Sequence, residues 1–451
     1  MSKQKIQLSD HFDYSRLLRF VLPCVGTMLF TSIYGIVDGL CVSNFVGKTA
    51  FAAVNLIMPV PMLVGSVGFM LGTGGSAIVG ITLGEGDREK ADRYFSLFVW
   101  TGLVAGLLLA VVGFFAVRPA VSLLGAKGEM LDYAVRYGRL LMACLPFFIL
   151  QNMFQSFFVT AENPHLGFAF TVAAGVTNMV LDVVLVGMLH GGVEGAAIAT
   201  FISQAVGGVL PVFYFLSRRS TSSIHLGRAQ WNGGVIRSAC INGSSELMTN
   251  LSMSLVNILY NYQLLRFAGE NGVAAYGVIM YAAFLFVAVF VGYAVGSAPI
   301  VSYHYGARNH AELNNLYSKS LRLIGVIAVV MTALSMLVIP YVARIFVGYD
   351  AELLALTSHA FRVYALNFFL MGFNVYGSSF FTALGDGVTS ALISFLRTLL
   401  FQLLALIFLP MVLGIEGVWL AVTAAEAGAL CVTVLMFITK DKVFHYRKVS
   451  C

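Results

Sequence analysis

Charged residues are scarce in this chain of 451 residues: they make up 11% of it, against a hydrophobic share of 59%. Soluble domains carry about 25% charged residues, so the composition excludes an ordinary soluble enzyme or binding domain. The apolar segments also lack the alternation of apolar and polar residues that the strands of a membrane barrel need. The absences leave a membrane protein built of helices.

Motifs for cofactors and catalysis are missing as well. The six cysteines form no C-x-x-C pair, and the chain has no P-loop, so neither a cysteine metal site nor ATP hydrolysis is supported. His304 and His310 are six residues apart, which is not the spacing of helical metal ligands. Basic residues do not gather with aromatics on a polar surface, so the net charge of +6 does not indicate a nucleic-acid partner. We expect no enzyme and no cofactor.

Long apolar runs dominate what is present. A spanning helix needs about 20 apolar residues. The first run is too long for a signal-peptide core, so we expect it to be retained. The sequence predicts an all-α integral membrane protein with twelve transmembrane helices, at 17–41, 50–82, 94–117, 133–160, 166–189, 194–216, 235–265, 273–301, 321–346, 355–383, 388–412 and 417–438.

The chain repeats itself. Residues 45–96 align with residues 267–318 without a gap, with thirteen identities at a shift of 222 positions. The same shift places Asn152 on Asn374 further along the chain. A fixed-period repeat of this kind indicates a duplicated architecture. We therefore predict two six-helix lobes, and membrane proteins made of two related halves are most often transporters.

The longest polar stretch, Ser217 to Trp231, joins the two copies. It predicts an N-lobe over 1–220, a cytoplasmic linker over 221–232 and a C-lobe over 233–451. With the N-terminus inside, the cytoplasmic segments hold eighteen Lys and Arg residues and the outer segments eight. The positive-inside rule then predicts that both termini are cytoplasmic. Six spans per half is an even number, so the halves form a parallel repeat.

Two acids lie within the predicted spans of the first half. A charged Asp at mid-helix costs about 2.5–3.5 kcal/mol, unless it takes up a proton, binds a cation or faces water. Asp38 lies in the first span and Asp182 in the fifth, with Asn178 on the same helical face as Asp182. Thr200 of the sixth span could complete a set of oxygen ligands, which suits a proton or a hard cation. The structural alternatives are a helix end for Asp38 and an interhelical hydrogen bond for Asp182.

The second half lacks these acids. The shift of 222 places Asp38 on Tyr260 and Asp182 on Leu404. A feature found in one half only is not a requirement of the shared fold, so we interpret it as functional.

The second half has polar residues of its own. Along the seventh span they recur at spacings of three and four and form one stripe. Such a stripe either lines a wet cavity or bonds neighbouring helices. Arg397 and Glu426 are also nominally intramembrane, and they could pair with each other or with Glu246. The stripe consists of Glu246, Asn250, Ser254, Asn257 and Asn261.

Three motifs make the chain similar to a known family. They are YGIVDG at Tyr34–Gly39, GKTAFAAVN at Gly47–Asn55 and TNMVLDVVL at Thr177–Leu185. The chain resembles the multidrug and toxic compound extrusion (MATE) transporters, most of all the prokaryotic branch associated with the DNA-damage-inducible F type. The resemblance implies a cation or proton site, binding Na⁺ in a sodium-coupled protein, and a bend of the first helix at Pro23. The implied site residues are Asp38, Asn178, Asp182 and Thr200, with Asn152 and Tyr34 as neighbours.

The function implied by the resemblance is antiport. Cationic or amphipathic organic compounds would leave the cell against inward H⁺ or Na⁺, and one charge crossing 100 mV releases about 2.3 kcal/mol. We expect a monomer in the bacterial inner membrane, with only small organic substrates and the lipid bilayer as partners. The alternative is a lipid-linked oligosaccharide flippase of the same superfamily, but those tend to have fourteen spans and several cavity arginines. The residues expected to line the substrate cavity are Tyr34, Glu246, Asn250, Asn257 and Asn261.

Overall fold

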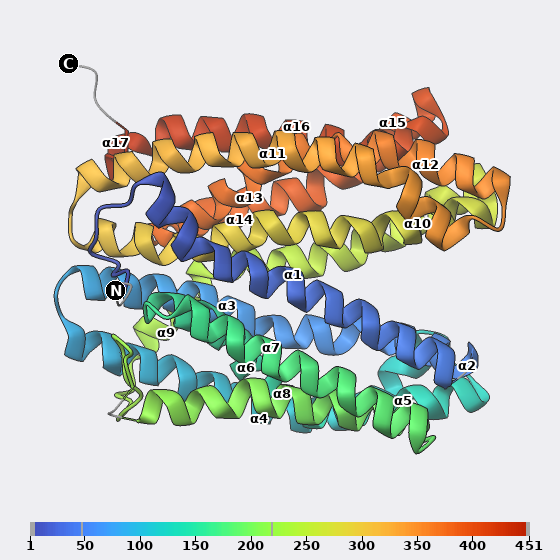
Figure 1. Cartoon of the computed structure of the whole chain (residues 1–451), viewed down its shortest axis with the longest axis horizontal. Helices are drawn as coiled ribbons and strands as arrows, with labels where there is room; N and C mark the ends of the chain where they lie inside the picture. The colour runs from blue at the N-terminus through green and yellow to red at the C-terminus, as the bar shows by residue number, and fades with distance from the viewer. Residues whose placement is uncertain (1–4, 47, 218–219, 448–451) are drawn as a thin grey trace.

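The structure is a computed structural model that describes residues 5–46, 48–217 and 220–447. Gly47, which begins one of the motifs above, lies outside the described residues. Within those ranges every regular element is helical. The helices form two groups that lie side by side, with α1–α8 in one and α10–α17 in the other (Figure 1).

The first group contains eight α-helices and one π-helical segment within the described residues. They are α1 (Tyr14–Phe45), α2 (Lys48–Ile57), α3 (Pro59–Gly84), α4 (Arg88–Leu123), α5 (Gly128–Ala143), α6 (Leu145–Thr160), α7 (Pro164–Leu181), the π-helical η1 (Asp182–Met188) and α8 (Gly192–Leu216). Pro23 lies inside α1, which continues through it.

After the non-helical linker, α9 (Gly233–Asn242) packs mainly against α3 of the first group. The second group then comprises α10 (Ser244–Gly306), α11 (His310–Val347), α12 (Ala351–Ala365), α13 (Phe368–Ala383), α14 (Gly387–Phe395), the π-helical η2 (Leu396–Leu400), α15 (Phe401–Leu413), α16 (Ile415–Thr439) and α17 (Asp441–Phe444).

The long element α10 is two spans joined by a sharp reversal. Gly269 lies in its middle with φ 59° and ψ −148°, a conformation that glycine adopts at little cost because it has no Cβ. On either side of it, the rings of Tyr260 and Tyr276 stack with centroids 4.8 Å apart. The Tyr276 hydroxyl donates to Asn257 Oδ1 at 3.1 Å. These contacts pair the two arms of α10 as an antiparallel hairpin.

The spans agree with the sequence pattern. Among the described residues, nine helices are long and apolar enough to cross a membrane. Two pairs, α5 with α6 and α12 with α13, each form one more span with bends of 54° and 46°. Together with the reversal in α10 they give the twelve predicted spans, and the all-α two-lobe fold is confirmed. The bends fall at Cys144 and Leu366, which are 222 positions apart.

Each lobe has an apolar core of its own, and a third apolar cluster joins residues from near the two ends of the described chain, among them Leu8 and Tyr446. We call this end of the bundle, at which α1 begins and α16 ends, the terminal end (Figure 1). The third cluster contains Leu8 and Phe12, which precede α1, together with Val159 of α6 and Phe380 of α13. The segment before α1 therefore packs against both lobes.

Candidate functional site

A pair of buried carboxyl groups lies in the first lobe. Asp38 lies inside α1 and is 9% exposed, while Asp182 begins η1 and is fully buried. Their side chains are close enough to interact directly. Within the described part of the chain, Oδ1 of Asp38 and both carboxylate oxygens of Asp182 have no hydrogen-bond partner. Buried polar atoms are almost always paired in proteins, so these three oxygens call for a proton, a cation or water.

Other polar side chains surround the two acids. Asn178 is 2% exposed, and its Nδ2 has no hydrogen-bond partner among the residues that the structure describes. Thr200 lies half-buried on α8, and its hydroxyl donates to the Ala196 carbonyl at 3.1 Å. Tyr34 lies beside Asp38. The arrangement brings together Asp38, Asp182 and Tyr34, with Asn178 one helical turn before Asp182.

Tyr137 of α5 lies near the same acids, and the sequence did not predict it as a site residue. It is fully buried, next to Thr200 and near both carboxyls. A tyrosine inside an apolar run is ordinary core by its pattern, so no spacing could have identified it. Only the packing of α5 against α8 brings it to the acids.

Asn152 belongs to α6, is 5% exposed, and its amide nitrogen has no hydrogen-bond partner among the described residues. None of the described hydrogen bonds joins its amide group to the aspartates. Its role in the cation site therefore remains a prediction from the resemblance.

The acid pair offers oxygen ligands only. The described residues contain no group of three or more His, Cys, Asp or Glu side chains that could hold a metal ion. A cation at this place would therefore depend on two carboxylates with amide and hydroxyl oxygens around them. Such a set suits a proton or a hard cation better than a transition metal.

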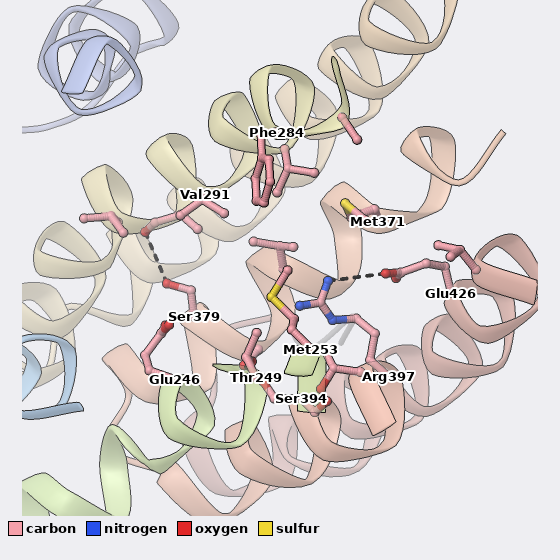
Figure 2. Close-up of a pocket in the computed structure, with 18 of the residues that line it drawn as sticks. Glu246, Thr249, Met253, Phe284, Val291, Met371, Ser379, Ser394, Arg397 and Glu426 are labelled. Carbon is pink, nitrogen blue, oxygen red and sulfur yellow. Dashed lines mark hydrogen bonds and ion pairs between the residues drawn. The ribbon is translucent and has the colours of Figure 1, made fainter. Parts of the chain in front are cut away.

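A cavity of 330 Å³ lies mostly within the second lobe (Figure 2). Its walls come from both arms of α10 and from α12–α16, while α3 and α6 of the first lobe contribute Thr73, Ser76, Ala77 and Ser156. Methionines and aromatic rings provide much of the lining. They include Met253, Met280, Met371, Tyr260, Tyr276, Phe284 and Tyr364.

An ion pair forms one side of this cavity. Arg397 Nη1 lies 3.3 Å from Glu426 Oε1, and the two side chains are 11% and 1% exposed. Asn374 Nδ2 donates to the other carboxylate oxygen of Glu426 at 2.7 Å. Thr433 in turn donates to Asn374 Oδ1 at 2.8 Å. Of the partners considered for Arg397, the structure therefore selects Glu426, and it holds that acid in a hydrogen-bonded network.

Glu246 lies on another side of the same cavity, as Figure 2 shows. In the described part of the chain its carboxylate forms no hydrogen bond or ion pair, although it interacts electrostatically with Arg397 across the cavity. Asn257 also lines the cavity. Asn250, whose side chain donates to the Glu246 carbonyl at 2.9 Å, does not line it. Asn261 is exposed elsewhere on α10.

The five residues expected to line the substrate cavity thus do not lie together. Glu246 and Asn257 line the cavity of the second lobe, whereas Tyr34 lies with the acid pair in the first. The acid pair and the cavity are separate features, because neither Asp38 nor Asp182 lines the cavity.

The chain thus has two repeated lobes, with a buried acid pair in the first and a largely apolar cavity mainly in the second. This is the architecture of a membrane transporter. Residues 23–184 and 247–407 match the MatE family model, which covers more than half of the chain. The chain belongs to this family, the MATE transporters.

Individual relatives span the same length. The chain is 21% identical over 434 residues to the multidrug export protein MepA of Staphylococcus saprophyticus, with 95% of each chain covered. It superposes on a crystal structure of MATE in complex with MaL6 with a TM-score of 0.92 and 25% identity, covering 98% of this chain and 100% of that one. An outward-facing multidrug resistance MATE family transporter has the same fold, with a TM-score of 0.92, 24% identity and 99% of each chain covered.

Proposed function

We propose that this protein is a secondary active antiporter that exports cationic or amphipathic organic compounds in exchange for H⁺ or Na⁺. The observation that carries the proposal is the buried pair Asp38 and Asp182, whose oxygens lack hydrogen-bond partners among the described residues and which has no acidic counterpart in the second lobe. The related staphylococcal proteins are multidrug export proteins, which supports efflux as the direction and organic compounds as the cargo. The bacterial origin of these relatives supports an inner-membrane location, and the lysine and arginine bias supports cytoplasmic termini.

Antiport requires that the coupling ion and the substrate stabilise different states of the transporter. The helix that carries Asp38 is suited to link them, because α1 also packs against α10 of the second lobe. That packing is close: a Cβ on Gly292 of α10 would lie 2.5 Å from the Cα atom of Val25 on α1. A change of charge or hydration at Asp38 can thus reach the lobe interface through one helix.

The second-lobe cavity has the character of a site for organic cations. Methionine and aromatic side chains adapt to many apolar shapes. The carboxylate of Glu246 supplies a negative charge that no described residue pairs with. The cavity offers few positive groups that could bind the pyrophosphate of a lipid. Arg397 is the single arginine among its described lining residues, and it is already paired with Glu426. The flippase alternative therefore gains no support.

Reconstituted transport tests the proposal. Purified protein in liposomes is given a proton gradient or a sodium gradient alone, and movement of the fluorescent cation ethidium is followed. We expect one of the two gradients to drive transport, and Asp38→Asn or Asp182→Asn to abolish it while the protein stays folded. The matched control is Asp132→Asn, which alters an exposed acid of α5. Undiminished ethidium transport by Asp38→Asn would contradict the proposal.

A further inference from the structure

Three charged side chains line the second-lobe cavity in the part of the chain that the structure describes: Glu246, Arg397 and Glu426. Arg397 and Glu426 form an ion pair at 3.3 Å, so their charges cancel. Glu246 has no such partner among the residues that the structure describes. With all three groups ionised, the cavity presents one uncompensated negative charge.

The ion pair is not a requirement of the duplicated fold. The shift of 222 positions places Arg397 on Gly175 and Glu426 on Gln204 of the first lobe, and both of those residues are neutral. Gln204 accepts a bond from Cys144 Sγ instead. Burying two opposite charges costs desolvation energy that their attraction does not always return. A pair that the sister lobe lacks therefore indicates a role in this cavity.

Arg397 is positioned so that its positive charge acts on a substrate bound in the cavity. It projects from the π-helical segment η2, and the figure shows its guanidinium group directed into the pocket between Met371 and Met253 (Figure 2). Its Nε has no hydrogen-bond partner among the described residues, and its described bond goes from Nη1 to Glu426. Glu426 is held in turn by Asn374, so the pair is fixed in position.

We propose that Arg397 sets the charge selectivity of the cavity, so that it takes organic monocations in preference to organic dications. Glu246 attracts the first positive centre of a substrate. A second positive centre in a cavity of 330 Å³ comes close to the guanidinium group and meets like-charge repulsion with no further free carboxylate to offset it. The inference rests on the proposed function and narrows its substrate class.

Two probes of nearly equal shape isolate the effect of charge. N-methyl-4-phenylpyridinium carries one positive charge, and methyl viologen carries two on a similar two-ring frame. Equilibrium binding of radiolabelled probes to the purified full-length protein gives both affinities. Because one close like-charge contact in a partly desolvated site changes binding by about tenfold or more, we expect wild type to prefer the monocation by that factor.

A series of charge variants then tests the cause. Arg397→Gln leaves two free carboxylates and should shift the preference toward methyl viologen by about tenfold. Glu426→Gln leaves the arginine uncompensated and should weaken binding of both cations. The double variant R397Q/E426Q restores one net negative charge and should return the wild-type preference. Met253→Glu adds a carboxylate to the cavity beside the guanidinium group while Arg397 and Glu426 both remain, so it should shift the preference as Arg397→Gln does, even if the latter fails to fold.

The outcomes separate the two ideas. An unchanged preference in folded Arg397→Gln, or in Met253→Glu, overturns the selectivity role. Loss of monocation binding by a folded R397Q/E426Q variant overturns it too, because the pair would then act through shape and not through net charge. If the wild-type protein binds both probes equally, the selectivity role is refuted but the proposed function is not. Wild type that binds neither probe counts against the proposed function itself. Asp132→Asn, remote from the cavity, serves as the control and should match wild type.

Discussion

Gly84 and Gly306, which are related by the repeat, each lie against the backbone of the other's helix. A Cβ on Gly84 would lie 2.0 Å from the Tyr303 carbonyl oxygen, and a Cβ on Gly306 would lie 2.0 Å from the Ile81 carbonyl oxygen. The two residues end α3 and α10, so this reciprocal contact fastens the lobes together at the terminal end. Any side chain larger than hydrogen must push the two helices apart.

Replacing either glycine with alanine should therefore open the terminal end. Overpacking typically costs about 1–3 kcal/mol, and here the cost falls only on the state in which the helices touch. We expect Gly84→Ala and Gly306→Ala to lengthen the distance between spin labels at Glu89 and Ala311, exposed positions that the repeat relates. Pulsed electron resonance in a background without native cysteines measures that distance. Gly277→Ala, where a Cβ meets nothing within 4 Å, is the control.

The segment before α1 makes a second connection between the lobes. The Leu8 amide donates to Glu162 Oε1 of the first lobe at 2.8 Å, and the Phe12 amide donates to Glu312 Oε1 of the second at 2.9 Å. His11 also lies 2.6 Å from Glu312. Both Leu8 and Phe12 are buried. The segment thus crosses the junction at the terminal end and is held by one acid on each side.

Removal of the second-lobe acid should release half of this segment. Hydrogen bonds to charged groups contribute about 1.5–3 kcal/mol each, so in Glu312→Ala the Phe12 amide should exchange with deuterium at least about tenfold faster. Peptide-resolved hydrogen–deuterium exchange of the detergent-solubilised protein measures this rate. Glu352→Ala, in the exposed first turn of α12, should leave it unchanged. Equal exchange in wild type and Glu312→Ala would show that the burial of Phe12 and the bonds that its carbonyl oxygen accepts from Asn315 and Lys319 hold the segment without the acid.

The spans were predictable because the membrane requires long apolar helices. The repeat showed which span of the first lobe corresponds to which span of the second. Asp38 and Asp182 were identifiable because an acid in an apolar run is costly and therefore conspicuous. That the two acids lie next to each other was not predictable, since a separation of 144 residues along the sequence says nothing about their distance in space. Only the packing of the folded helices brings the two carboxyls together.

Three features left no local signal. Tyr137 reads as core, and the crossing of the segment before α1 depends on two acids that are 150 positions apart, Glu162 and Glu312. The pairing of Arg397 with Glu426 was one of two possibilities, because a helical pattern cannot say which of two acids faces an arginine on another helix. In each case the missing information is tertiary packing.

An ion pair outside the spans gives a pH-dependent prediction. Asp386 caps α14, and Lys440 Nζ lies 2.7 Å from its Oδ2. Burial alone would raise the pKa of the Asp386 carboxyl, but bonds from Lys440 and Thr389 outweigh it and hold the pKa below its usual value. A lowered folded-state pKa stabilises the protein above the unfolded pKa of about 4, and this contribution is lost as the pH falls through the folded-state pKa.

Asp386→Asn keeps the helix cap and loses the ion pair. It should lower the stability by about 0.5–1 kcal/mol near neutral pH, and the difference from wild type should vanish as the pH falls from neutral through the folded-state pKa of Asp386. Thermal unfolding in detergent across this pH range measures it. Asp350→Asn makes the same substitution at the α12 cap, whose acid has no ion pair among the described residues, and should show little change at any pH. A constant difference for Asp386→Asn would mean that the charge of Asp386 is irrelevant.

Tyr137→Phe tests whether the neighbourhood of the acid pair extends to α5. The substitution removes one hydroxyl beside Thr200 and near both carboxyls, and it leaves the buried ring in place. If that hydroxyl helps to hold the coupling ion, its loss should weaken the apparent affinity for the driving ion by about 3–30-fold, in line with about 0.7–2 kcal/mol for one hydrogen bond. Transport into liposomes at graded ion concentrations gives this affinity. Tyr133→Phe is the matched control, because Tyr133 lies one turn earlier and bonds to Glu129 at 3.1 Å on the exposed side of α5. An unchanged ion affinity in Tyr137→Phe would exclude the Tyr137 hydroxyl on α5 from the ion site.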